Sequence, residues 1–136
     1  YIQSYEGEFK NGKYHGYGLE IGNDKYIYKG EWKNGLREGR GIQISFKKDD
    51  NFVYVGNFKD NKWFGVGIMY FADGSKYYGE HERGRTGQGI LVSADGKVKV
   101  GIWNRNEYEG PLPEGVAQKF TVELLQKEIA INIGAM

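Results

Sequence analysis

The sequence predicts a mainly β protein: one elongated, single antiparallel sheet of successive β-hairpins, with an α-helix at its C-terminal end. Three observations lead to this prediction. A short aromatic motif recurs along the chain, a Gly-x-Gly pair follows it at a nearly constant offset, and turn dipeptides such as Asn-Gly separate short alternating segments. We therefore divide the chain into a repeat array over residues 1–112 and a C-terminal helical tail over residues 113–136.

The aromatic motif occurs five times. Its first copy reads Tyr-Glu-Gly-Glu-Phe, and the copies begin at residues 5, 28, 54, 77 and 99, which are 23, 26, 23 and 22 residues apart. His81 replaces the last ring of the fourth copy, and Lys99 replaces the first ring of the fifth. The fifth copy also lacks a second glycine after Gly110, as expected of a unit that ends an array. The longest interval predicts an enlarged loop around residues 47–51.

Each unit predicts one β-hairpin. In the first unit, residues 5–10 and 16–21 are short alternating segments, and Asn11-Gly12 lies between them, where both residues tolerate a positive φ. Further turn dipeptides are Asn34-Gly35, Asp73-Gly74 and Asp95-Gly96. Because connections this short join neighbouring strands, we expect the strands to run antiparallel and the sheet to grow one hairpin at a time.

Alternation along the strands places the aromatic residues and the glycines on one face of the sheet. If residue 9 pairs with residue 16 and residue 7 with residue 18, each ring can cover the bare backbone of a glycine. The opposite face is then aliphatic and needs a cover, because a single layer buries little surface. We expect a helix from Glu114 to about Ile131 to provide it, either on its own sheet or on a second copy.

Composition excludes several classes of protein. A length of 136 residues suits one domain, and 22 glycines with only 2 prolines exclude a collagen-like chain. The 11 Tyr, 7 Phe and 3 Trp argue against disorder, and the net charge of +1 argues against a nucleic-acid-binding protein. No apolar run approaches the ~18 residues of a membrane span, and no signal peptide is recognisable. Because the chain begins with Tyr1 rather than Met, we expect it to be part of a longer protein.

No motif predicts catalysis, a cofactor or a metal site. The absence of cysteine excludes thiolate ligands and disulfides, and the two histidines, His15 and His81, lie in different units without a second candidate ligand nearby. The Gly-x-Gly pairs recur in every unit and therefore indicate a structural role rather than phosphate binding. Four glutamates occupy strand positions: Glu6, Glu8, Glu31 and Glu80. We interpret them as a solvated face of cross-strand ion pairs with neighbouring Lys and Arg side chains.

The repeated residues resemble the MORN (membrane occupation and recognition nexus) repeat, whose signature is roughly Tyr-x-Gly-x-Trp, a turn and Gly-x-Gly. The resemblance covers residues 5–112. It implies a non-enzymatic scaffold or adaptor, since members of this family serve as cytoskeletal scaffolds, dimerise through their repeat arrays and bind helical tails of motors and other partners. It also implies contact with phosphoinositides or a membrane surface. Such repeats are attached to lipid kinases and methyltransferases as well, so an enzyme could lie elsewhere in a parent chain.

The first candidate binding surface is the row of motif aromatics, here called the aromatic spine. The spine consists of Tyr5, Phe9, Tyr28, Trp32, Tyr54, Phe58, Tyr77, His81 and Trp103. Two interpretations remain open, because these rings either form only the core of the repeat or also line a trough for an amphipathic helix. We expect a protein partner, which is a helix or a second copy, and dimerisation through the last units, where the sheet has an open edge.

The second candidate surface is the edge formed by the turns within the hairpins. It carries the basic residues Lys10, Lys13, Lys33, Arg37, Lys59, Lys62, Arg83 and Arg85. Cations stacked ~10 Å apart along a sheet attract anionic lipid headgroups by about 1 kcal/mol each, although nearby acidic residues dilute them. The alternative function is therefore a peripheral membrane or phosphoinositide-binding module. We expect a cytoplasmic location, at the cytoskeleton or at the cytoplasmic face of a membrane.

Overall fold

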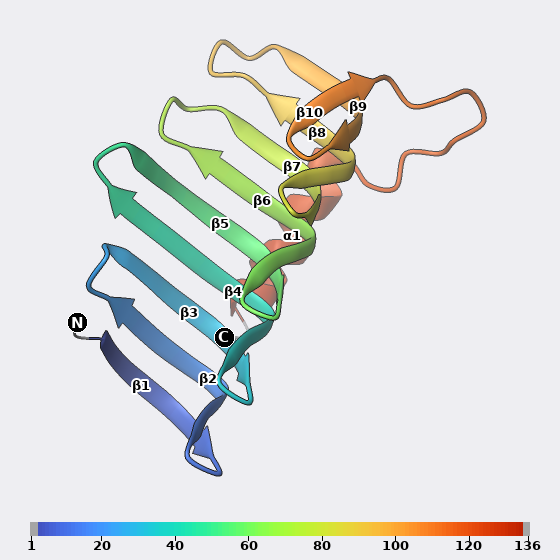
Figure 1. Ribbon diagram of the computed structural model, residues 1–136. Helices are drawn as coiled ribbons and strands as arrows, with labels where there is room; N and C mark the ends of the chain where they lie inside the picture. Colours follow the sequence, from blue (N-terminus) through green and yellow to red (C-terminus); the bar gives the residue numbers. More distant parts are fainter. Residues whose placement is uncertain (1–2, 135–136) are drawn as a thin grey trace.

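The computed structural model describes residues 3–134 and confirms the mainly β fold class (Figure 1). Ten strands form one open antiparallel sheet in which the spatial order follows the sequence order. The strands are β1 (Gln3–Lys10), β2 (Lys13–Gly22), β3 (Tyr26–Lys33), β4 (Leu36–Lys47), β5 (Asp50–Lys59), β6 (Lys62–Phe71), β7 (Lys76–Glu82), β8 (Arg85–Val92), β9 (Val98–Asn104) and β10 (Glu107–Gly110). The helix α1 (Val122–Gly134) lies behind the sheet in Figure 1.

Each of the first four hairpins contains a β-bulge that the sequence did not predict. Gly7 pairs with Gly18 as expected, but Phe9 pairs with Tyr14 rather than with residue 16, because the register shifts between Gly7 and Phe9. The same shift recurs between the motif glycine and the last motif residue in the next three hairpins. The expected contact between an aromatic ring and the first Gly-x-Gly glycine therefore forms with the following hairpin, where Trp32 pairs with Gly16. A bulge adds one residue to one strand and increases the local twist of the sheet.

A row of facing glycines crosses the sheet, and the first tyrosine of each motif covers it. Gly79 pairs with Gly89, and a Cβ atom built on Gly89 would lie 2.1 Å from the Tyr77 hydroxyl oxygen. The Tyr77 hydroxyl donates a hydrogen bond of 3.0 Å to the carbonyl of Glu80, the bulged residue. Equivalent bonds of 2.8, 2.8 and 2.9 Å are made by Tyr5, Tyr28 and Tyr54. Each tyrosine therefore links the glycine row to the bulge of its own hairpin.

The fifth hairpin reaches the same arrangement with a different residue. Lys99 occupies the position of the motif tyrosine, and the ring of Tyr108 on β10 instead lies 2.8 Å from a Cβ built on Gly101. The Tyr108 hydroxyl donates to the carbonyl of Val100 at 2.8 Å. A ring supplied by the returning strand thus covers the last glycine of the row.

The expected enlarged loop at residues 47–51 is wrong. The extra residues lengthen the paired strands β4 and β5, which run to Lys47 and from Asp50, with Lys48 and Asp49 forming a tight turn. Paired strands satisfy the backbone hydrogen bonds of these residues, whereas a loop would leave them to solvent.

The helix α1 packs on its own sheet, on the face opposite the aromatic spine. Leu125 and Ile129 are buried there against Val55, Ile68 and Tyr78, with further aliphatic side chains around them. This contact decides between the two placements left open by the sequence. Among the described residues, this helix is too short and too polar to cross a membrane.

The helix begins at Val122, later than the expected Glu114. The side chain of Gln88 holds the preceding segment in place, because its amide donates to the carbonyl of Ala117 and accepts from the N–H of Lys119. The hydroxyl of Thr121 then accepts a hydrogen bond from the N–H of Leu124 and so caps the first turn. The contacts of Gln88 come from a distant strand, and together with the local cap they define the helix start.

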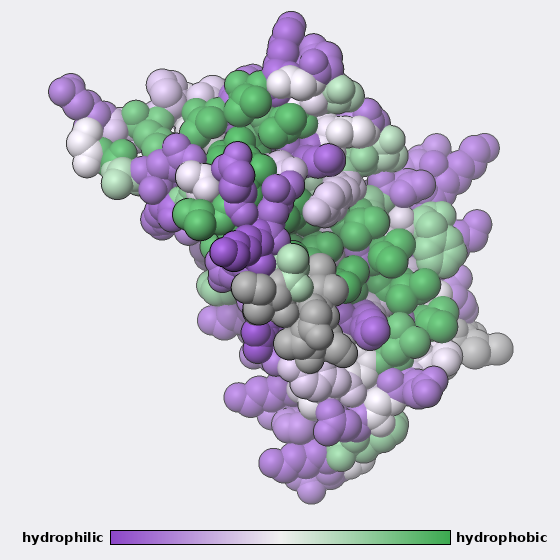
Figure 2. Space-filling view, turned by 180° about the vertical axis from the view of Figure 1, so that it is seen from behind, coloured by the Kyte–Doolittle hydropathy of each residue, from purple (hydrophilic) through white to green (hydrophobic). Residues whose placement is uncertain are grey.

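The helix covers only part of the aliphatic face. Tyr17, Ile21, Ile44 and Phe46 are more than one-third exposed. Of these, Ile21 and Ile44 lie opposite Ile27 in the strand register. Figure 2 shows hydrophobic surface on this side of the molecule, extending to the right of the grey atoms. The face over β2–β4 therefore remains apolar and accessible.

The substitution Leu125→Ala should destabilise the protein by about 2–5 kcal/mol, because it removes a side chain that is 1% exposed and leaves a cavity under α1. Urea unfolding followed by circular dichroism measures this change. The matched control is Leu124→Ala, since Leu124 is 62% exposed and its loss should change stability by less than about 0.5 kcal/mol. Equal effects of the two substitutions would contradict the docking of α1 on the sheet.

The substitution Gly89→Ala should destabilise the protein by about 1–3 kcal/mol, because the new methyl group meets the Tyr77 ring. In a Tyr77→Ala background the same substitution should have almost no effect. A double-mutant cycle of unfolding free energies measures this coupling. Additive effects would show that the ring does not depend on the bare backbone.

Candidate binding face

The aromatic spine is one continuous ladder of rings in edge-to-face contact. Tyr28 lies 5.0 Å from Trp32 of its own unit and 4.9 Å from Phe58 of the next, measured between ring centroids. Tyr54 makes the same two kinds of contact with Phe58 and His81, at 5.2 and 5.0 Å. Interplanar angles of 83–89° in these four pairs match the geometry that aromatic quadrupoles favour. The ladder joins each hairpin to its neighbour.

Most of the spine is core. Seven members are at most 5% exposed: Tyr28, Trp32, Tyr54, Phe58, Tyr77, His81 and Trp103. Tyr5 is half-buried, and Phe9 at the N-terminal edge is 61% exposed. A partner that approached this face would therefore meet other side chains first.

Those side chains form a second row that the sequence reasoning missed, here called the flanking row. Each member is paired across a hairpin with the last motif residue of its unit, and the members are Tyr14, Arg37, Trp63, Arg85 and Tyr108. None of the five is fully buried. The signal for this row was a fixed offset, since Tyr14, Arg37 and Trp63 each lie nine residues after the start of their motif.

The two arginines of the flanking row lie flat on the spine. The Arg37 guanidinium carbon is 5.4 Å from the centroid of the Tyr28 ring, and that of Arg85 is 5.0 Å from the Trp103 centroid. Such cation–π contacts favour a guanidinium on an aromatic surface. Half-buried apolar residues extend the face on either side: Tyr26, Phe52, Phe71 and Leu91.

The motif glutamates form the expected ion pairs only in part, because Glu8, Glu31 and Glu80 also accept hydrogen bonds from backbone N–H groups. The Glu80 carboxylate accepts a hydrogen bond of 2.8 Å from the backbone N–H of Gln88, and Glu8 accepts one of 2.6 Å from Tyr17. Glu31 accepts from the N–H of Arg40 in the same way. Ion pairs accompany two of these contacts, Arg40–Glu31 at 3.7 Å and Lys119–Glu80 at 3.1 Å. The carboxylates thus satisfy backbone donors beside the bulges, which explains their fixed position.

The basic turn residues divide into two groups. Six are exposed on the edge of the sheet: Lys10, Lys13, Lys33, Lys59, Lys62 and Arg83. Arg37 and Arg85 instead turn onto the aromatic face, where Arg37 pairs with Glu20 at 3.4 Å. Glu38 on the same edge accepts a hydrogen bond from the N–H of Asp60.

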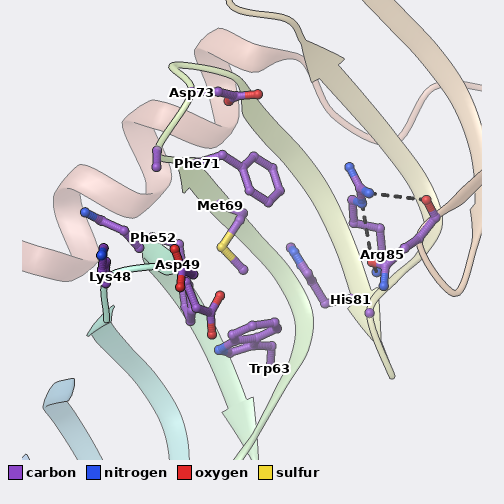
Figure 3. A pocket seen from close by; sticks show the side chains of 14 residues that line it. Lys48, Asp49, Phe52, Trp63, Met69, Phe71, Asp73, His81 and Arg85 are labelled. Carbon is purple, nitrogen blue, oxygen red and sulfur yellow. Dashed lines mark hydrogen bonds between the residues drawn. The ribbon is translucent and has the colours of Figure 1, made fainter. Parts of the chain in front are cut away.

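A cavity of about 630 Å³ opens on the aromatic face beside the fourth unit (Figure 3). Successive turns are joined by backbone hydrogen bonds from Gly35 to Tyr14, from Asn61 to Arg37 and from Asn106 to Arg85. Within residues 3–134 the equivalent bond from Gly84 to Trp63 is missing. His81 and its partner Arg85 are four positions apart, whereas the corresponding pairs are five apart, so this turn is shorter.

His81 lies at this cavity and replaces a larger ring. The equivalent tryptophans, Trp32 and Trp103, donate their indole N–H to the carbonyls of Gly18 and Gly89. Neither nitrogen of His81 makes a hydrogen bond of standard geometry within the described chain. Burial lowers the pKa of His81 to about 4, against the opposing effect of the Gly65 and Gly79 carbonyls. The imidazole is therefore neutral at pH 7.

Nothing in this face resembles a catalytic or metal centre. Among the residues that the structure describes, no three His, Asp or Glu side chains are grouped so that they could hold a metal ion. The face offers aromatic surface, two guanidinium groups and one cavity, which suit binding rather than bond-making chemistry.

Comparison with known families identifies the repeat. The family model described as the MORN repeat matches residues 5–25, 28–47, 54–76 and 77–98. These four segments cover more than half of the chain and correspond to the first four hairpins. No curated protein matches the chain.

Acid should destabilise the protein through His81, because an unfolded histidine with an ordinary pKa of 6.5 binds a proton that the buried ring does not. This part of the stability is complete above pH 6.5 and falls by up to about 3 kcal/mol as the pH decreases toward 4. Urea unfolding at pH 7.5 and 4.5 measures it. His81→Phe is the control, because it should remove this part of the pH dependence while the carboxylates still titrate. Identical pH profiles would contradict the burial of a neutral imidazole.

Proposed function

Because the chain belongs to the MORN repeat family, we propose that it is a non-enzymatic scaffold whose aromatic face binds a protein partner. MORN repeats are generally modules for interaction with proteins or membranes, and the family is non-catalytic. The observation that supports the protein-binding function is the open aromatic face. It carries the flanking row and Tyr26, Phe52, Phe71 and Leu91, while α1 lies on the opposite side.

An exposed row of aromatic side chains favours a protein interface. Rings such as Trp63 and Tyr108 bury a large area with few rotatable bonds, and extended apolar surfaces on soluble domains mark interaction sites. The spine beneath them is rigid, because it is packed from strand to strand. A preorganised surface loses little conformational entropy when a partner binds.

The spacing of the hairpins suits a helical partner. Two strands at ~4.8 Å each place successive hairpins about 10 Å apart, and seven residues of an α-helix rise about 10.5 Å. A helix that crosses the strands would present the same face to each hairpin in turn, with one anchor per heptad. A second copy of the chain is the other protein partner, since the short strand β10 leaves its outer edge unpaired among the described strands.

The basic turn edge supports an alternative function in membrane binding. Its six exposed cations form a surface separate from the aromatic face and could contact anionic headgroups. For either function we propose a cytoplasmic location, at the cytoskeleton or at the cytoplasmic face of a membrane.

The combined substitution Tyr14→Asp and Leu91→Asp should reduce partner capture at least tenfold, because it puts charge on the aromatic face. Photo-crosslinking from p-benzoylphenylalanine at position 71, followed by mass spectrometry in extracts of the native cell, measures the capture. Tyr17→Asp on the opposite face is the control and should leave it unchanged.

Flotation with phosphoinositide-containing liposomes distinguishes the membrane-binding function from the scaffold function. Reversal of charge at Lys33, Lys59 and Lys62 should leave partner capture intact. If it abolishes flotation while the aromatic variant captures its partner normally, the membrane function is correct and the scaffold function is wrong.

A further inference from the structure

Arg85 is a partly buried guanidinium without a counter-ion. Its Nε and Nη2 donate to the side-chain and backbone oxygens of Asn106 at 3.3 and 3.2 Å, and both acceptors are neutral. Within residues 3–134 no carboxylate forms an ion pair with it. Burial lowers the pKa of Arg85, as expected when the charged form is poorly solvated.

The equivalent arginine of the second unit has its counter-ion. Arg37 pairs with Glu20, whose strand partner is Tyr28. In the fourth unit the residue opposite the equivalent Tyr77 is Met69. Met69 therefore stands where the repeat places the glutamate in the earlier unit, and a thioether cannot balance a guanidinium charge.

The arginine without a counter-ion and two residues that depart from the repeat meet at one cavity. Arg85, Met69 and His81 line the 630 Å³ cavity together with the rings of Phe52, Trp63 and Phe71. Figure 3 shows His81 between Met69 and Arg85. Asn106, which accepts the two hydrogen bonds of the Arg85 guanidinium, also lines the cavity. His81 is 2% exposed, and neither of its nitrogens makes a hydrogen bond of standard geometry within the described chain. A cavity that is lined by aromatic rings and contains a buried polar group with unsatisfied hydrogen bonds is typical of a ligand site.

We propose that this cavity binds the carboxylate of a Glu or Asp side chain of the protein partner, beside a bulky apolar residue of the same segment. The inference rests on the proposed scaffold function and specifies the chemistry of its partner. The carboxylate takes the place that Glu20 holds in the second unit and receives the Nη donors of Arg85 that Asn106 leaves free. The apolar residue packs against Phe52, Trp63 and Phe71.

The size and charge of the cavity agree with such a segment. Its volume exceeds that of one carboxylate and lies within the ~300–1,000 Å³ of typical ligand sites. Asp49, Asp50 and Asp73 also line the cavity, and none of them forms an ion pair with Arg85. These acidic side chains repel a carboxylate and favour its binding at Arg85. Met69 is a flexible side chain that can move to admit the ligand.

The test uses two blocked dipeptides, acetyl-Phe-Glu-amide and its neutral isostere acetyl-Phe-Gln-amide, with phenyl phosphate as a third probe. Binding to the full 136-residue chain is followed by NMR shifts of the Trp63 indole and the Arg85 Nε–H. We expect the Glu dipeptide to bind at least fivefold more tightly than the Gln dipeptide and phenyl phosphate. Arg85→Gln should remove this preference. The matched control is Arg83→Gln, which changes the charge equally at an exposed position two residues away.

A second variant supplies the missing counter-ion within the chain. Met69→Glu should block binding of the Glu dipeptide, whereas Met69→Gln should not. If Met69→Glu does not fold, the comparison of Arg85→Gln with Arg83→Gln still tests whether Arg85 binds the carboxylate. Equal affinity for both dipeptides, tighter binding of phenyl phosphate, or equal effects of the two arginine substitutions would overturn the proposal. If the chain captures a protein partner but shows no preference for the Glu dipeptide, this inference alone is refuted. If the chain binds the Glu dipeptide but captures no protein partner, the scaffold function is refuted.

Discussion

The tyrosine ring that lies across each pair of facing glycines is the contact on which the rest of the sheet depends. Bare backbone at positions such as Gly79 and Gly89 allows the Tyr77 ring to lie flat on the strands, and its hydroxyl then reaches the carbonyl of the bulged residue. The bulge turns the motif glutamate so that its carboxylate satisfies a backbone donor on the next strand. The last motif ring then lies against the preceding hairpin, where His81 pairs with Gly65 and Trp103 with Gly87. One local contact therefore connects every hairpin to the next.

A single-layer sheet has no second sheet to pack against, so its buried residues lie on its two faces. In this protein the two faces are buried in different ways. On one face the aromatic spine buries itself by packing ring against ring, which leaves the flanking row accessible. On the other face, aliphatic residues are buried only where α1 covers them. The tail therefore stabilises the array without occupying the aromatic face. Because α1 covers only the aliphatic face, the aromatic face remains accessible to a partner.

The third and fourth units depart from the repeat at positions that lie together in space. The turn of the fourth unit is shorter, His81 replaces a larger ring, and Met69, on the adjoining strand of the third unit, stands where the first unit has Glu20. Each change alone would be a small irregularity of the core. Together they open the cavity and leave Arg85 without a counter-ion, so the departures from regularity form a specific site. Departures of this kind are expected where function competes with local consistency.

The sequence by itself determined the hairpins, the order of the strands and the nine spine residues, because motif period, turn dipeptides and alternation are local properties of the chain. It missed the bulge after Gly7, the late start of α1 at Val122 and the role of the glutamates. Each of these depends on a particular side-chain hydrogen bond: Tyr5 with the carbonyl of Glu8 on its own strand, Gln88 with the tail, and Glu80 with a backbone N–H on the neighbouring strand. The flanking row and the cavity were decided in the same way. Only the tertiary structure brings Met69, His81 and Arg85 together, because their proximity results from strand register rather than from their spacing along the chain.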